Sequence, residues 1–89
     1  MNNLQLIPVI RTKPNKWEAI GIVGDISIRA ILKERPDGSC RGIINLVHEG
    51  QGYDKEQTHA SVDNALYELN QVCGPLGFEF QVVKTCISA

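Results

Sequence analysis

Apolar and polar residues alternate most clearly on either side of Gly24-Asp25, over residues 17–23 and 26–33. A two-residue loop with Gly first is typical of a type II′ hairpin turn, and such a turn fixes which residues face each other. One predicted face carries Val23 with Ile26, Gly21 with Ile28, Ala19 with Ala30, and Trp17 with Leu32. The other carries Ile22 with Ser27, Ile20 with Arg29, and Glu18 with Ile31. A slip by one residue would bury the charged set, so the register is well specified.

A helical pattern follows between Asp54 and Gly74. Asp54 is a favourable N-cap residue, Gln57 occupies the third position of a capping box, and Gly74-Pro75 can end a helix. Six apolar residues recur at helical spacing: Val62, Ala65, Leu66, Leu69, Val72 and Cys73. The pattern predicts one long amphipathic helix over 54–73 that packs on a sheet.

Three further segments have the composition of strands: 4–12, 40–48 and 78–87. Pro8 lacks the N–H that a central strand needs, so the first strand is expected at an edge or with a bulge. The loop before 40–48 holds three or four residues, which leaves the faces of that strand open. Residues 49–53 are expected to form a flexible lead-in to the helix. The last strand is expected at an edge or beside the first strand.

These elements follow the order β-β-β-β-α-β. The order predicts an α+β fold: a two-layer sandwich whose mainly antiparallel sheet is covered on one face by a single long helix. No linker or internal repeat divides the 89 residues, so residues 1–89 are predicted to form a single domain.

The composition narrows the class of protein. Nine basic side chains against ten acidic ones give a formal charge of −1, whereas dedicated nucleic-acid binders more often carry a basic excess. The N-terminus lacks the features of a signal peptide, and no apolar run has the roughly 18 residues that span a membrane. Three widely spaced cysteines, Cys40, Cys73 and Cys86, fit reduced thiols. We therefore expect a cytoplasmic protein without membrane contact.

Motifs for cofactors and metals are missing. Gly50 and Gly52 are too few for a phosphate loop, and Asp54 beside them would repel a phosphate. Cys40, His48 and His59 are eight and eleven positions apart, without the close spacing of a metal site. We expect no cofactor, no metal and no catalytic residue. A small enzyme or ligand-binding protein built around His48, at the end of a strand, is the third-ranked hypothesis.

The face of the hairpin that the helix leaves bare is the predicted partner surface. It carries Ile20, Ile22, Arg29 and Ile31, and neighbouring isoleucines on adjacent strands are typical of contact surfaces. A small domain with such a face is often a dimer with two-fold symmetry. The leading hypothesis is therefore a small, non-catalytic, homodimeric binding domain that acts through protein–protein contact, as an accessory regulator or inhibitor does.

The alternative hypothesis is a sheet that binds single-stranded nucleic acid. Four basic residues near the second turn could contact phosphates: Arg29, Lys33, Arg35 and Arg41. Aromatic residues that could stack on bases are few, and Trp17 belongs to the apolar face of the hairpin. This hypothesis therefore ranks second.

Overall fold

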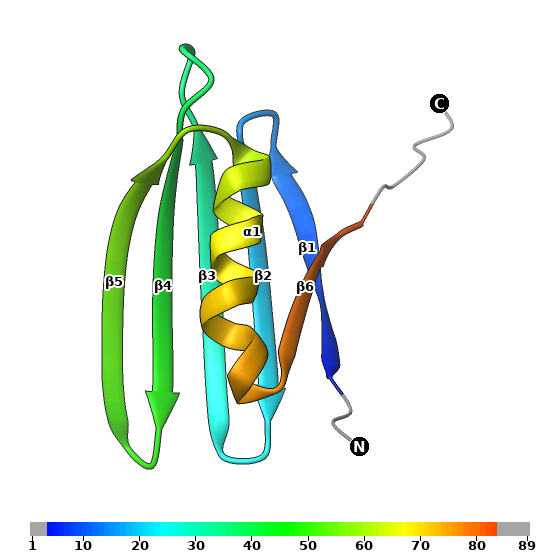
Figure 1. Ribbon diagram of the computed structural model, residues 1–89, viewed down its shortest axis with the longest axis vertical. Helices are drawn as coiled ribbons and strands as arrows, with labels where there is room; N and C mark the ends of the chain where they lie inside the picture. The colour runs from blue at the N-terminus through cyan, green and yellow to red at the C-terminus, as the bar shows by residue number, and fades with distance from the viewer. Residues whose placement is uncertain (1–3, 84–89) are drawn as a thin grey trace.

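The computed structural model describes residues 4–83, which form one six-stranded sheet with one helix across it (Figure 1). The elements are β1 Gln5–Lys13, β2 Lys16–Val23, β3 Ile26–Glu34, β4 Cys40–His48, β5 Gln51–His59, α1 Val62–Cys73, the 3₁₀ turn η1 Gly74–Leu76, and β6 Phe78–Val82. The strand order is β5-β4-β3-β2-β1-β6, with every neighbouring pair antiparallel except β1 and β6. The predicted α+β class with a mainly antiparallel sheet is confirmed.

The β2–β3 hairpin has the predicted register. Val23 pairs with Ile26 and Trp17 with Leu32, and all the pairs between them agree with the predicted faces. Gly24 has a φ of +61° and Asp25 has a negative φ, as in a type II′ turn. The turn and the apolar pairing therefore select the same register.

Pairing of β4 with β3 settles which residues of β4 face the helix. Ile44 lies opposite Ala30 and Leu46 opposite Ile28, so these two side chains point to the side of α1. Ile43 lies opposite Ile31, so it points to the other side.

The predicted long helix is wrong in its first part. Residues Gln51–His59 form β5, and α1 spans only the twelve residues from Val62, with the Ser61 side chain accepting a hydrogen bond from the Asn64 N–H. Glu49 and Gly50 both have positive φ, 53° and 79°, which makes a tight type I′-like hairpin turn in place of a flexible lead-in. The element order is thus β-β-β-β-β-α-β. An edge strand exposed on both faces needs no apolar alternation, so the polar composition of β5 resembled the start of a helix.

The expected edge position of β1 is also wrong, because β1 lies between β2 and β6. The register shift of β1 against β2 falls between Arg11 and Lys13, not at Pro8. The pairing of β1 is divided: residues 10–13 pair with β2, while residues 5–9 pair with β6. The Gln5 N–H and the Val9 carbonyl both bond towards β6. Backbone hydrogen-bonding groups alternate between the two sides of a strand, so the backbone nitrogen of Pro8 points towards β2. Residues 5–9 do not pair with β2, so the missing N–H of Pro8 costs no hydrogen bond there.

The last strand, β6, lies at a sheet edge beside β1, as expected, and runs parallel to it. Residues 84–87 of the predicted strand lie outside the described residues. Two hydrogen bonds connect β6 to the helix: the Asn70 amide donates to the Phe80 carbonyl (3.2 Å), and the Phe80 N–H donates to Asn70 Oδ1 (2.7 Å). The helix therefore holds the edge strand by polar as well as apolar contacts.

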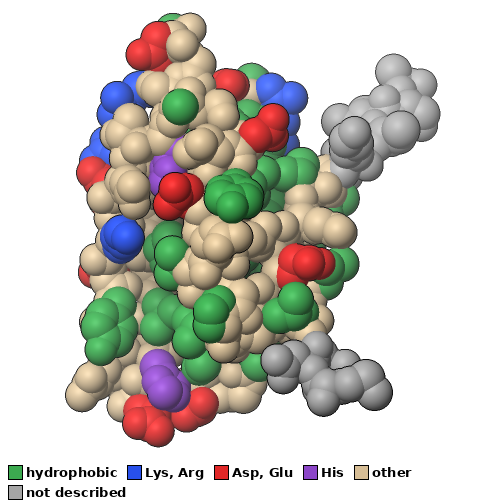
Figure 2. All heavy atoms as spheres, viewed as in Figure 1, with side chains coloured by type: hydrophobic (Ala, Val, Ile, Leu, Met, Phe, Trp, Pro, Cys, Tyr) green, Lys and Arg blue, Asp and Glu red, His purple; other side chains and the backbone are tan. Residues whose placement is uncertain are grey.

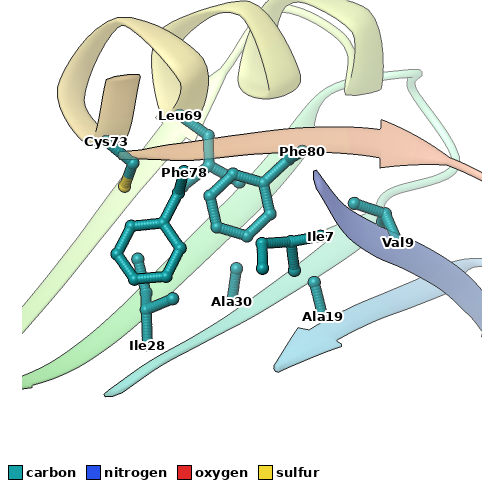
Figure 3. Packing of buried hydrophobic residues seen from close by; sticks show 9 residues of the cluster. All are labelled: Ile7, Val9, Ala19, Ile28, Ala30, Leu69, Cys73, Phe78 and Phe80. Carbon is teal, nitrogen blue, oxygen red and sulfur yellow. The ribbon is translucent and has the colours of Figure 1, made fainter. Parts of the chain in front are cut away.

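The core lies between α1 and the sheet (Figure 3). Its main cluster consists of Ile7, Val9, Ala19, Ile28, Ala30, Leu69, Cys73, Phe78 and Phe80. Gly21 leaves room for two core side chains, because a Cβ there would lie 2.5 Å from Ile7 Cδ1 and 3.3 Å from Phe78 Cε1. The predicted helix stripe is buried at Ala65, Leu69 and Cys73, whereas Val72 is half exposed.

The described cysteines are core residues. Cys40 and Cys73 are both free and buried. Burial raises the pKa of the Cys73 thiol from 9.0 to about 11, and burial together with the nearby Glu34 charge raises the pKa of Cys40. Both side chains therefore behave as small apolar groups.

Replacing the helix cap tests the corrected start of α1. Ser61→Ala should lower the free energy of unfolding by about 1 kcal/mol, because it removes the acceptor for the Asn64 N–H. Asp54→Ala should cost at most about 0.5 kcal/mol, since Asp54 accepts only an exposed bond from the Asn45 amide. Urea unfolding measures both values. A larger loss of unfolding free energy for Asp54→Ala than for Ser61→Ala would contradict a helix that begins at Val62 and favour one that begins at Asp54.

The buried thiols predict how stability depends on pH. At pH 9 the unfolded chain begins to ionise Cys73, while the folded protein keeps the proton up to about pH 11. The unfolded state then binds fewer protons, so the free energy of unfolding should fall as the pH rises through this window. Urea unfolding of the natural chain and of Cys73→Ala at pH 8 and pH 10 measures the fall. An equal pH dependence in both proteins would contradict the assignment to Cys73.

Candidate functional site

The side of the sheet opposite α1, named here the open face, has no helix over it among residues 4–83 (Figure 1). Side chains that alternate with the buried ones point to this face. They include Leu6, Pro8 and Ile10 of β1; Lys16, Glu18, Ile20 and Ile22 of β2; Ser27, Arg29, Ile31 and Lys33 of β3; and Arg41, Ile43, Asn45 and Val47 of β4. The four predicted contact residues thus share one face.

Four aliphatic side chains on β1 and β2 form the apolar patch of this face: Leu6, Ile10, Ile20 and Ile22. Their exposed fractions are 51%, 50%, 67% and 69%. A shallow hollow of about 300 Å³ beside the patch is lined by Pro8, Ile10 and Ile20, among others. The sequence analysis missed Leu6 and Ile10, because the hairpin pattern does not show which strand lies next to β2.

Ile31 contributes less to the surface than predicted. It lies between Glu18 of β2 and Ile43 of β4 and is half-buried. The larger side chains on both neighbouring strands cover it. Ile22 lies opposite the short Ser27, and the Arg29 opposite Ile20 pairs with Glu18. Ile20 and Ile22 remain exposed.

The charges in the middle of the open face are paired. Arg29 Nη2 lies 3.2 Å from Glu18 Oε1, and Lys16 Nζ lies 3.7 Å from Glu18 Oε2. Hydrogen bonds from the Thr12 hydroxyl and the Arg29 guanidinium keep the pKa of Glu18 below its usual value. Arg29 therefore lies beside the apolar patch with its charge neutralised by Glu18.

One end of the open face carries a basic row: Lys16, Lys33 and Arg41, which are cross-strand neighbours on β2, β3 and β4. Lys13 pairs with Lys16 across the β1–β2 hairpin. Arg41 binds Glu56, but Lys33 has no ion pair within residues 4–83. Since Glu18 pairs with Lys16 and Glu56 with Arg41, Lys33 is the member of the row whose charge stays unpaired within these residues.

The proposed nucleic-acid contacts are brought together only in part. Lys33 and Arg41 are neighbours, and Arg35 lies in the loop at the same end, whereas Arg29 lies further along the sheet beside Glu18. The open face of residues 4–83 presents no aromatic side chain. Trp17 is on the helix side, where the Arg11 Cζ lies 5.2 Å from the centroid of its ring.

The outer edge at β5 is strongly charged. Asp54, Lys55 and Glu56 follow one another near its centre, and all are exposed. If the β5 strands of two copies paired antiparallel around Lys55, Lys55 of one copy would lie opposite Lys55 of the other. Asp54 of each copy would lie opposite Glu56 of the other copy. This edge therefore disfavours growth of the sheet into a second chain.

The helix side has a second hollow of about 550 Å³, between α1 and the β4–β5 hairpin. Its apolar lining comes from Ile44, Leu46, Tyr53, Val72 and Leu76. Figure 2 shows this face, with hydrophobic side chains at the lower left over the part of the sheet that α1 leaves bare. The helix thus covers the sheet incompletely on its own side.

His48 lies at the rim of this hollow, and its side chain is 45% exposed. Its Nε2 is 3.6 Å from Asp25 Oδ2 and 4.0 Å from Glu49 Oε1, a grouping of two hairpin turns that the sequence analysis missed. Cys40 and His59 pair with each other at the opposite end of β4. The three residues considered as metal ligands are therefore not brought together. A partly exposed imidazole beside two carboxylates on two turns is not a catalytic arrangement by itself.

Within residues 4–83 the single α-helix is too short and too polar to cross a bilayer. A search of family models, curated proteins and solved structures finds none that matches this chain.

Proposed function

We propose that this chain is a small, non-catalytic binding domain that acts through protein–protein contact at its open face, and that it forms a homodimer there. The observation that carries the proposal is the apolar patch. Four aliphatic side chains on two adjacent strands are each at least half exposed, on a side that α1 does not reach. Apolar groups concentrated on one sheet face are typical of a surface that another protein covers.

The size of the face suits a stable interface. Five strand spacings of about 4.8 Å and strands about 30 Å long give an area of roughly 700 Å². Each partner in a standard protein–protein interface buries about 800 Å². Burial of a fully exposed aliphatic side chain contributes roughly 1.5–3 kcal/mol. The patch side chains are half to two-thirds exposed, so each can contribute about half to two-thirds of that value and offset part of the entropic cost of association.

The partner that best matches the open face is a second copy of this chain. Face-to-face packing with two-fold symmetry places the same patch on both sides, so both copies bury their aliphatic side chains at once. Association through the β5 edge would instead bring like charges together. In such a dimer the helix side stays free, and its hollow beside Ile44 and Tyr53 is available for another protein. An accessory regulator or inhibitor, acting in the cytoplasm where Cys40 and Cys73 stay reduced, would have this arrangement.

The basic row favours a second candidate function, the binding of single-stranded nucleic acid. Lysine and arginine side chains in line can follow a phosphate backbone. We rank this function lower for two reasons. The open face of the described chain offers no aromatic ring for base stacking, and Arg29 and Arg41 are already engaged by Glu18 and Glu56.

A charge placed in the apolar patch tests the proposal. We expect light scattering to show a dimer for the natural chain and a folded monomer for Ile22→Glu, because association would bury an unpaired carboxylate. Tyr67→Glu is the matched control: Tyr67 is 64% exposed on α1, away from the open face, and this variant should stay dimeric. Circular dichroism checks that each variant is folded. A natural chain that is monomeric at high micromolar concentration, or a dimeric Ile22→Glu, would refute the proposal.

A further inference from the structure

We infer that the groove between α1 and β5, on the helix side of the sheet, binds an amphipathic α-helix of a partner protein. The observation behind it is that β4, β5 and α1 all turn apolar side chains towards this groove. In Figure 1, α1 lies in front of β2 and β3, and no helix of residues 4–83 lies in front of β4 or β5. The groove is on the opposite side of the sheet from the open face, so binding there does not depend on self-association.

The groove consists of two hollows that share Ile44, Lys55 and Val72. Its wider part is the hollow of about 550 Å³ already described, and a narrower part continues along α1 towards the start of the helix. Val72 belongs to the apolar stripe of α1 but is 49% exposed, and Tyr53 on the opposite side of the hollow is 64% exposed. The helix and the two strands therefore present more apolar surface here than the described chain buries.

The uncovered strip has the width of one helix. Two strands at a spacing of about 4.8 Å are roughly 10 Å wide, and an α-helix with its side chains is roughly 10–12 Å across. Packed helices lie about 8–10 Å apart, so a second helix beside α1 would rest over β4 and β5. A small molecule fits less well, because ligand pockets enclose about 70–90% of the ligand surface. Tyr53 and Val72, on the two sides of the wider hollow, are instead open to solvent.

The β5 side of the groove carries a positive charge. Lys55 lies opposite Ile44 of β4 and so points to the helix side, where it has no ion pair within residues 4–83. Its acidic neighbours Asp54 and Glu56 point to the open face, and they bind Asn45 and Arg41 there. A carboxylate on the partner helix would therefore neutralise Lys55 beside an apolar contact.

The α1 side of the groove carries a negative charge. Glu68 lines the narrower part, is exposed, and forms no ion pair with Lys55. At the other end of the groove, His48 stands beside Asp25 and Glu49. The partner helix that matches these charges has an apolar stripe, acidic residues on the flank towards β5 and basic residues on the flank towards α1. Such a helix binds by apolar anchors one turn apart, as helices in grooves do.

Two designed peptides test the groove. The first is a fluorescein-labelled helix with leucines on one face, glutamates on one flank and lysines on the other; the second has lysines on both flanks. Fluorescence anisotropy should give saturable binding of the first peptide. Lys55→Glu should raise the Kd for the first peptide about fivefold and lower the Kd for the second, because the charge at one contact changes sign. Lys33→Glu makes the same charge change on the open face, where Lys33 has no ion pair within the described residues, and should leave both Kd values within about twofold.

Val72→Glu should raise the Kd for the first peptide by at least about tenfold, because the peptide would bury its carboxylate. Two controls carry the same new charge outside the groove: Tyr67→Glu on α1 and Ile22→Glu on the open face should both keep the Kd within about twofold. Circular dichroism checks that each variant is folded. Unchanged binding by Ile22→Glu separates this site from the proposed dimer interface, so a monomeric natural chain would refute the dimer alone.

Three results would overturn the inference. The first is that neither peptide binds saturably, or that binding survives Val72→Glu. The second is that Lys55→Glu leaves both Kd values unchanged, which removes the charge match with the partner helix. Decanoate, an apolar chain with one carboxylate, provides the third: saturable binding of decanoate that Val72→Glu abolishes, without binding of either peptide, would assign the groove to a small amphiphile.

Discussion

The fold of residues 4–83 depends on one imbalance: a sheet of six strands is covered by a single helix of twelve residues. The helix buries its stripe of Ala65, Leu69 and Cys73 against one side of the sheet. Apolar residues on that side become a core, because they exchange water for close packing. On the other side no helix among residues 4–83 covers the sheet, and four aliphatic side chains stay at least half exposed: Leu6, Ile10, Ile20 and Ile22. The same alternation of side chains along β2 therefore produces both the core and the candidate interface.

Packing in the core also fixes β6 as the strand at one edge of the sheet. Phe78 and Phe80 of β6 pack beneath the helix, and the two hydrogen bonds of Asn70 fix β6 against α1. The first half of β1 pairs with β6 on one side and does not pair with β2 on the other. Pro8 and Gly21 suit this junction, one by lacking an N–H and the other by lacking a Cβ that would meet Ile7. Packing of the helix thus closes one edge of the sheet, while charge protects the other edge at β5.

The sequence predicts well the parts in which burial and turn chemistry agree. The β2–β3 register and its faces follow from the Gly24-Asp25 turn together with apolar alternation. The helix over residues 62–73 follows from apolar periodicity. β5 could not be found in this way, because an edge strand exposed on both faces leaves no periodic signal, and Asp54 with Gln57 satisfies the rules for a helix cap. The position of β1 and β6 depends on contacts between residues distant in the chain. The hairpin pattern alone places four residues on one face: Ile20, Ile22, Arg29 and Ile31. It does not show that Leu6 and Ile10 join that face, or that Lys13 pairs with Lys16, because those neighbours depend on the position of β1.

The central claim is that Ile20 and Ile22 are covered by a partner in solution, and the accessibility of their methyl groups tests it most directly. Relaxation of methyl NMR signals by an inert paramagnetic compound in the solvent reports that accessibility. At a concentration where the chain associates, the methyls of Ile20 and Ile22 should be protected nearly as well as those of Ile28, which is 1% exposed. Val72, half exposed on the helix side, should stay accessible. Ile20 and Ile22 methyls that remain as accessible as Val72 at every concentration would contradict the account.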